Sequence, residues 1–187
     1  MNMKTIIDVN AHLHTPYSFS AFKDVRQALD MAAAEGVEVV GINDFYSLDG
    51  YREWNDECAA RHLYPMFNIE FISLNSEDQA AGLRANNPGR TYLSGKGLAY
   101  PVILSGKEAQ MLADVRAESN AQVERMCAKL NAHLDEVKAG FNVDFKYIVK
   151  ELTRGSVRER HLAKALRMAV DAKADKIQDR LALYERI

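Results

Sequence analysis

The sequence has too little cysteine for a disulfide-rich protein or a cysteine-based zinc site. It contains only two cysteines, Cys58 and Cys127, which lie far apart and match no Cys-x-x-Cys spacing. Such cysteines are typical of reduced thiols in a cytosolic protein, and a disulfide is the less favoured alternative. The chain also has no internal repeat, low-complexity tract or flexible linker. With a length of 187 residues, the chain is expected to form one domain, or one domain with a helical appendage.

Long apolar runs and a strong charge of either sign are missing as well. No stretch approaches the ~20 apolar residues that a membrane span requires. The first residues, Met1–Lys4, lead into a short strand without the apolar region of a signal peptide. A formal net charge of −2 does not favour a mainly electrostatic nucleic-acid binder, although a local basic patch stays open. We therefore expect a cytoplasmic protein with no membrane contact.

The apolar pattern predicts strands and helices in alternation over the first third of the chain. Residues 23–35 and 48–62 have the helical period, with inward positions at Val25, Leu29, Tyr51, Trp54 and Cys58. The intervening apolar runs at 5–9, 37–42 and 64–69 are typical of strands, and the second is apolar enough to be covered on both faces. Three strand–helix units in succession indicate a parallel α/β architecture, either an open sheet or a barrel.

The rest of the sequence changes character. Residues 75–97 are rich in glycine and asparagine and predict a long surface loop, and residues 98–104 predict a short strand. Helices are expected over 106–139, 144–153 and 157 to near the end, with Ser105 and Glu108 in a capping-box spacing and Ser156 as a cap. We expect a βα core at 1–104 and a mainly helical segment at 105–187, inserted in or continuing the same domain. The long helix at 106–139 is a candidate surface for self-association or for a partner.

Two histidines follow the first strand at a spacing of two residues. Because residues i and i+2 of a strand point to the same face, His12 and His14 are expected to converge on one point. Pro16 then ends the strand. Two imidazoles that meet at the mouth of a strand suit a divalent metal, although histidines of a half-buried strand that only form hydrogen bonds are the alternative.

Acidic residues stand at the ends of the next two predicted strands. Asp44 follows the second strand and Glu70 follows the third. Sites in parallel α/β folds form at the carboxyl ends of the strands, so these two carboxylates and the two histidines should approach one another. Taken singly, Asp44 has an alternative role as a cap near Ser47, and Glu70 as an ordinary solvent-exposed carboxylate.

Three successive segments resemble the motifs of the polymerase and histidinol phosphatase (PHP) domain family. They are His12-Leu-His14-Thr-x-x-Ser18, Gly41-Ile-Asn-Asp44-Phe-Tyr-Ser-Leu-Asp-Gly-Tyr51 and Asn68-Ile-Glu70-Phe-Ile-Ser73. Arg160-His161-Leu-Ala-Lys-Ala-Leu166 is similar to a later Arg-x-His-x-Ala segment of the family. The resemblance implies part of a distorted (β/α)7 PHP-type barrel with a helical C-terminal portion, two or three divalent metals, and hydrolysis of phosphate esters.

The chain also departs from the family pattern at several expected ligands. Phe45 stands where the family usually has histidine, Phe19 or Ser20 replaces a further ligand, and Tyr92 stands in the place of another histidine. The family's late Asp-x-His pair has no counterpart. These departures reduce the expected cofactor to one well-held divalent ion, Zn, Mn or Fe. Its expected ligands are His12, His14, Glu70 and Asp44, with Asp44 also a catalytic candidate.

Basic residues near the glycine-rich segment are candidates for holding a phosphate. Arginine binds phosphate through two parallel bonds, and glycines let backbone amides approach an anion. A solvated loop is the equal alternative. The candidate substrate-binding residues are Arg84, Arg90, Tyr92 and Lys96, and His161 is a candidate catalytic residue at a helix start.

These observations favour a metal-dependent hydrolase of phosphate esters that acts on a small phosphorylated metabolite or nucleotide. Nucleic acid is a possible but less favoured substrate. The alternative is a PHP-like binding or scaffold module without catalysis. The resemblance also predicts further strands beyond residue 187, and so a longer natural protein.

Overall fold

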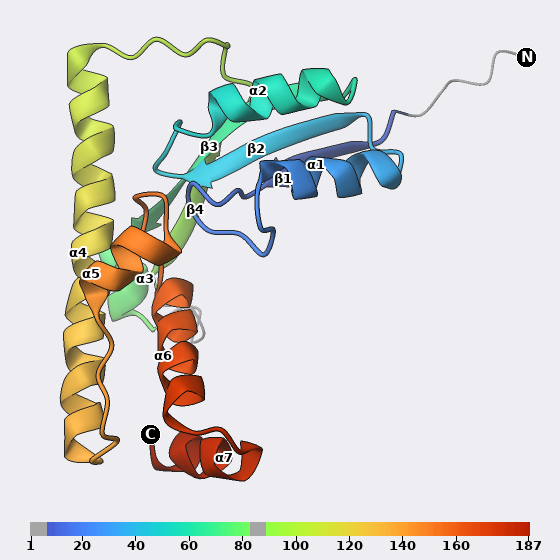
Figure 1. Ribbon diagram of the computed structural model, residues 1–187. Helices are drawn as coiled ribbons and strands as arrows, with labels where there is room; N and C mark the ends of the chain where they lie inside the picture. Colours follow the sequence, from blue (N-terminus) through green and yellow to red (C-terminus); the bar gives the residue numbers. More distant parts are fainter. Residues whose placement is uncertain (1–6, 83–88) are drawn as a thin grey trace, which may run out of the picture. The chain divides into compact units, whose positions relative to one another are not determined.

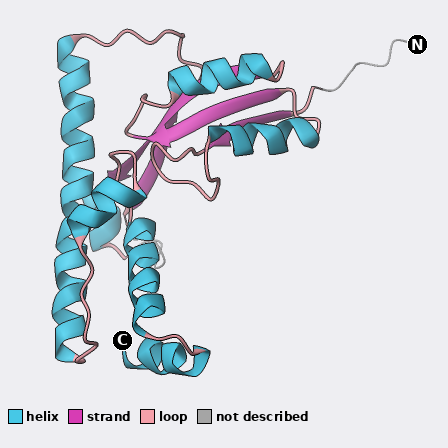
Figure 2. Cartoon of the chain, in the orientation of Figure 1, coloured by secondary structure: helices cyan, strands magenta, loops and turns pink. Residues whose placement is uncertain are grey.

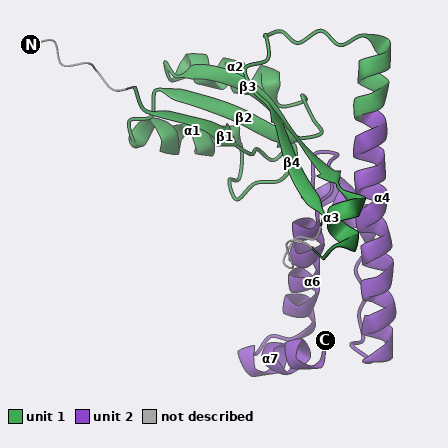
Figure 3. Ribbon diagram, turned by 180° about the vertical axis from the view of Figure 1, so that it is seen from behind, with its two compact units in different colours: residues 1–112 green, residues 113–187 purple. Residues whose placement is uncertain are grey.

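A computed structural model describes residues 7–82 and 89–187 of the chain (Figure 1). The chain divides into two compact units, residues 1–112 and 113–187 (Figure 3). Each unit has its own hydrophobic core, the first around Trp54 and Leu29 and the second around Leu134 and Ile148. Among the helices of the described residues, none combines the length and the apolar character needed to cross a membrane.

The first unit is built on a curled four-stranded sheet with the order β1-β2-β3-β4, which resembles half of a barrel (Figure 2). Its strands are β1 (Val9–Leu13), β2 (Val39–Phe45), β3 (Tyr64–Leu74) and β4 (Arg90–Gly95). β1, β2 and β3 are parallel, whereas β4 runs antiparallel to β3. The expected parallel α/β architecture is therefore found for the first three strands, and the described residues do not confirm that the sheet is part of a (β/α)7 barrel.

Two helices cover the sheet of this unit, α1 (Val25–Ala34) and α2 (Tyr51–Ala60). Asp24 caps α1 by accepting a hydrogen bond from the Gln27 amide, and Gly36 follows the helix with a φ of +79°. The inward positions expected from the sequence, including Leu29 and Trp54, are fully buried. β2 is buried over nearly its whole length, as its continuous apolar character predicts.

The second half of this unit differs from the expectation. β3 continues past Glu70 to Leu74, so Glu70 lies within the strand and not at its end. The segment expected to be one loop contains the short helix α3 (Ser76–Ala80) and strand β4, while the expected strand at 98–104 is not formed. β4 is a short edge strand in a glycine-rich stretch and forms by pairing with β3, so local periodicity does not predict it.

The second unit is helical. It contains most of α4 (Gly106–Glu136), then α5 (Phe145–Tyr147), the π-helical segment η1 (Ile148–Leu152), α6 (Glu159–Lys173) and α7 (Ile177–Arg186). Ser105 and Glu108 form the expected capping box of α4. The predicted last helix is instead two helices, and Arg158 rather than Ser156 occupies the N-cap of α6.

Candidate metal centre

The site begins with an irregularity in β1. Asn10 pairs with Val40 and Leu13 pairs with Ile42, so β1 contains one more residue than β2 over this interval. Such a bulge changes the direction of the side chains next to it. It leaves the Ala11 carbonyl to accept bonds from the Asn68 amide at 3.1 Å and from Lys96 Nζ at 3.0 Å.

Gly41 makes the close approach of these strands possible. A Cβ atom at this position would lie 2.6 Å from Asn68 Nδ2 and 2.8 Å from the Ala11 Cα. Real Cβ atoms do not approach other heavy atoms so closely, so a larger residue would push β1 away from β2. Gly41 therefore helps to set the position from which His12 projects.

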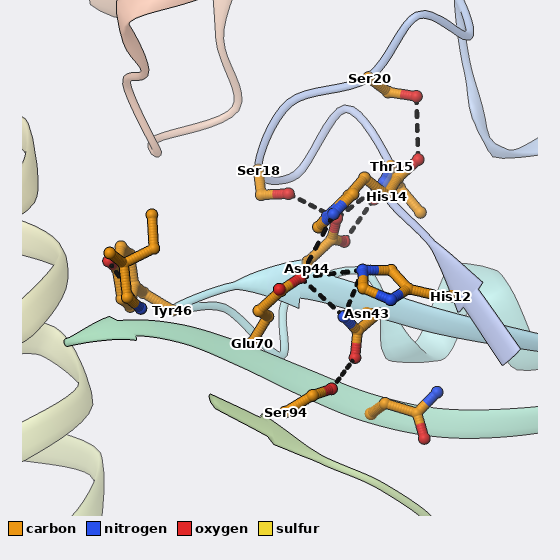
Figure 4. Close-up of polar contacts among 12 residues, drawn as sticks. His12, His14, Thr15, Ser18, Ser20, Asn43, Asp44, Tyr46, Glu70 and Ser94 are labelled. Carbon is orange, nitrogen blue, oxygen red and sulfur yellow. Dashed lines mark hydrogen bonds and ion pairs between the residues drawn. The ribbon is translucent and has the colours of Figure 1, made fainter. Parts of the chain in front are cut away.

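His12, His14 and Glu70 come together as the sequence predicts (Figure 4). One potential ligand atom from each lies within 4.8 Å of the other two. His12 Nε2 is 3.0 Å from Glu70 Oε2, and His14 Nε2 is 3.3 Å from the same oxygen. The Glu70 side chain is only 6% exposed, whereas that of His12 is 52% exposed, so the cluster opens to solvent on the His12 side.

The donor set fits a divalent cation. Two imidazole nitrogens and one carboxylate oxygen are ligands that Zn²⁺, Mn²⁺ and Fe²⁺ accept, and three protein ligands leave further positions for water or substrate. Within residues 7–82 and 89–187, one group of three or more histidine, cysteine or acidic residues has its potential ligand atoms within 4.8 Å of one another. This group is His12, His14 and Glu70.

Asn43 is a buried member of the site that the sequence did not single out. Its Nδ2 group donates to Glu70 Oε2 at 2.8 Å and lies 2.9 Å from His12 Nε2. Its Oδ1 atom accepts from Ser94 Oγ at 2.6 Å and from Lys96 Nζ at 3.0 Å. The sequence does place Asn43 two residues before Phe45, so the two side chains lie on the same face of β2. Because Phe45 stands at an expected ligand position, this spacing indicates that Asn43 faces the site.

Asp44 lies on the opposite face of β2 and outside the group of three. Its carboxylate accepts bonds from the Thr15 amide at 2.7 Å, the Thr15 hydroxyl at 2.5 Å and the Ser18 hydroxyl at 2.6 Å. Burial raises the pKa of Asp44 to about 6, and the bonds from Ser18 and Thr15 lower it in part. These contacts tie the loop after His14 to β2. The alternative role of Asp44 as a helix cap near Ser47 is not supported, because its hydrogen bonds among the described residues go to Thr15 and Ser18.

Aromatic rings pack against His14 where the family resemblance leads one to expect polar ligands. The Phe45 ring stacks on the imidazole at 4.8 Å with an interplanar angle of 11°, and the Phe19 ring stacks at 5.1 Å with an angle of 27°. Tyr92 lies 6.3 Å from the Phe45 ring and is 48% exposed. The aromatic packing fixes the orientation of His14 by van der Waals contact.

The described candidate substrate residues lie in β4 or directly after it, at different distances from the cluster. Lys96 reaches the site through Asn43, and burial lowers the pKa of its ammonium group. Arg90 pairs with Leu74, whereas Ser94 pairs with Glu70, so Arg90 is four residues from the cluster, or roughly 13 Å along the strand. Arg84 lies outside the described residues.

His161 belongs to the second unit, where it has a local structural role. Its Nδ1 atom accepts the backbone N–H of Arg158 at 3.0 Å and thereby helps to begin α6. Burial, followed by the charges of Lys164 and Arg158, lowers its pKa. Its role in catalysis stays a prediction.

No protein-family model and no curated protein sequence matches the chain. Two solved structures are similar over nearly all of it. A protein named provisionally as a metal-dependent phosphoesterase, from Bifidobacterium adolescentis, has 19% sequence identity and a TM-score of 0.65, covering 94% of this chain and 54% of that one. An amidohydrolase from Chromobacterium violaceum, with bound sulfate and no metal, has 18% identity and a TM-score of 0.63, covering 95% of this chain and 54% of that one.

The chain thus spans about half the length of the structures that it matches. At these identities the likeness shows only that the chain shares its fold with the two structures. The cluster of His12, His14 and Glu70 provides, on that fold, a set of ligands suited to one metal ion.

Proposed function

We propose that the chain is part of a metal-dependent phosphoesterase in which His12, His14 and Glu70 hold one divalent cation. The observation that carries this proposal is the approach of both imidazole Nε2 atoms to the same buried carboxylate oxygen. The cation is Zn, Mn or Fe, and the substrate is a small phosphate ester. The sheet, on this proposal, is one part of a (β/α)7 barrel of the PHP type.

A cation held by these residues would act as a Lewis acid toward a phosphoryl oxygen and would lower the pKa of a water bound to it to ~7. The residues of the chain provide the remaining functions. Lys96 uses two of its three N–H donors on Ala11 and Asn43, and we assign the third to a substrate phosphate. Tyr92, at the exposed end of the aromatic packing, would contact the group esterified to that phosphate.

Arg90 extends the proposed binding site along β4. Arg90 would contact the distal part of a longer substrate, such as a nucleotide, since it lies four residues from Ser94 on β4. Arg84 stays a candidate from the sequence. His161 lies in the second unit and stays a candidate acid or base from the sequence. The bound sulfate in the Chromobacterium structure supports a site for a tetrahedral anion in that protein.

Hydrolysis of an aryl phosphate by the metal-loaded protein tests the proposal. Protein freed of metal with a chelator is reloaded with Mn²⁺ or Zn²⁺, and phosphate release from p-nitrophenyl phosphate is measured. We expect metal-dependent release that Glu70→Gln abolishes, because the variant loses the anionic ligand. Glu38→Gln, at an exposed position of the same unit, is the matched control and should retain the activity. Metal binding without phosphate release would contradict the phosphoesterase assignment.

The second candidate function is a metal-binding or scaffold module without hydrolysis. It is favoured by the aromatic rings of Phe19 and Phe45, which pack on His14 in place of polar groups. On this alternative, α4 serves as the docking element for a second copy or another protein. Its exposed apolar residues Met111, Val115 and Met126 are the candidates for that contact. A shift in molar mass on Met111→Lys, measured by light scattering, would support this alternative.

A further inference from the structure

The orientation of the Asn43 side-chain amide can be assigned from its partners. Lys96 Nζ is only a donor, so the atom of Asn43 that lies 3.0 Å from it must be the oxygen. Ser94 Oγ, 2.6 Å from the same oxygen, supplies a second donor. The amide NH2 group therefore faces the opposite way, toward His12 and Glu70.

This orientation brings a donor to the atoms that would bind a cation. Asn43 Nδ2 is 2.8 Å from Glu70 Oε2 and 2.9 Å from His12 Nε2. A cation would need the lone pairs of both atoms, at about 2.0–2.2 Å. The NH2 group donates to the Glu70 oxygen, and its partial positive charge repels a cation that approaches this oxygen and His12 Nε2.

Rotation of the amide by 180° would reverse this effect. Oδ1 would then face the cation, and a carbonyl-type oxygen is a ligand that Mn²⁺ accepts. The rotated amide would, however, place its NH2 group against the Lys96 ammonium, which has no acceptor. Lys96 opposes the rotation, and it remains near the site because the Ala11 carbonyl, exposed by the bulge in β1, accepts a second bond from it.

We propose that Asn43 is an internal competitor for the metal, and that Lys96 holds it in the competing orientation. The amide replaces the cation in the metal-free protein, and the exchange of one for the other sets the metal affinity of the site. Removal of the Lys96 ammonium is then expected to tighten metal binding. The inference rests on the proposed metal site and concerns its affinity, not its activity.

Metal titration of a double-mutant cycle separates this effect from simple charge repulsion. Metal-free wild type, Lys96→Met, Asn43→Ala and the double variant are titrated with Mn²⁺ by calorimetry at one pH and salt concentration. Lys23→Met removes an exposed lysine of the same unit and is the matched control. Circular dichroism checks that each variant is folded, and Lys96→Ala replaces Lys96→Met if the latter is not.

We expect Lys96→Met to lower the Kd by about tenfold in the wild-type background, the scale of a hydrogen bond to a charged group. In the Asn43→Ala background, the same change should alter the Kd by less than about threefold, because the amide is absent. An unchanged or higher Kd in Lys96→Met would overturn the inference. So would an equal gain in both backgrounds, which would assign the effect to charge alone.

These outcomes are distinct from failure of the proposed function. Tight binding by wild type with no gain in Lys96→Met would leave the metal site standing and reject the role of Asn43. If no variant binds Mn²⁺, both the site and the inference are rejected.

Discussion

Asp44 combines complete burial with partners that carry no charge. The Thr15 amide and the hydroxyl groups of Thr15 and Ser18 donate to its carboxylate. Burial nevertheless dominates, and it raises the pKa of this carboxyl from 3.8 to about 6. Unfolding returns the carboxyl to water and to its ordinary pKa. The folded chain therefore holds this proton at pH values where the unfolded chain has already released it.

The direction and size of the effect on stability follow from this difference. A pKa that is raised by folding contributes stability that is complete below the unfolded pKa of 3.8 and is lost as the pH rises through about 6. The difference between the two pKa values corresponds to up to about 3 kcal/mol, at about 1.4 kcal/mol per pKa unit. Asp44→Asn keeps the shape of the side chain and removes the titration.

Urea unfolding measures this contribution. Trp54, the single tryptophan, is buried in the core of the first unit, so its fluorescence reports the unfolding of that unit. We expect the unfolding free energy of wild type, relative to that of Asp44→Asn, to fall by up to about 3 kcal/mol between pH 4 and pH 7.5. If the difference in unfolding free energy between wild type and Asp44→Asn is the same at both pH values, the raised pKa of Asp44 is refuted. A difference that grows with pH would show that the hydrogen bonds outweigh burial and lower the pKa.

Three further predictions concern other parts of the molecule. Gly41→Ala should weaken Mn²⁺ binding at least about tenfold in a calorimetric titration, because the new Cβ displaces the backbone of β1; unaltered binding would contradict this. Cys58 is fully buried and its pKa is raised to about 12, so we expect no reaction with a disulfide reagent at pH 8 before unfolding, and prompt labelling would contradict its burial. Asn131→Ala removes bonds to both backbone groups of Val143 and should cost about 1–3 kcal/mol in urea unfolding of the second unit, compared with about 0.5 kcal/mol for the exposed Lys129→Ala; equal costs would contradict this reasoning.

The sequence predicted the parts of the fold that depend on local periodicity. The buried faces of α1 and α2 follow from the helical spacing of residues such as Leu29 and Trp54. The approach of His12, His14 and Glu70 follows in part from the order of the parallel strands, because Glu70 pairs with Phe45, the last residue of β2, although β3 continues beyond it. Both arguments need only neighbouring residues and the order of the strands.

The remaining features depend on contacts between distant segments. β4 pairs with β3 only after an intervening glycine-rich segment, and this pairing brings Ser94 and Lys96 to Asn43. The bulge at Ala11 reflects the register between β1 and β2, which local propensity does not specify. By contrast, the separation of Asp44 from Asn43 follows from strand alternation, once β2 is known to continue through both residues.

The number of metal ions bound per chain tests the central claim most directly. Metal-free protein is dialysed to equilibrium against excess Mn²⁺ or Zn²⁺, and the bound metal is measured by mass spectrometry. We expect about one ion per chain for wild type and almost none for the His12→Ala/His14→Ala variant. The His62→Ala/His133→Ala variant removes two histidines outside the cluster and should bind the same amount as wild type. Equal binding by all three proteins, or none by wild type, would contradict the proposed metal site of His12, His14 and Glu70.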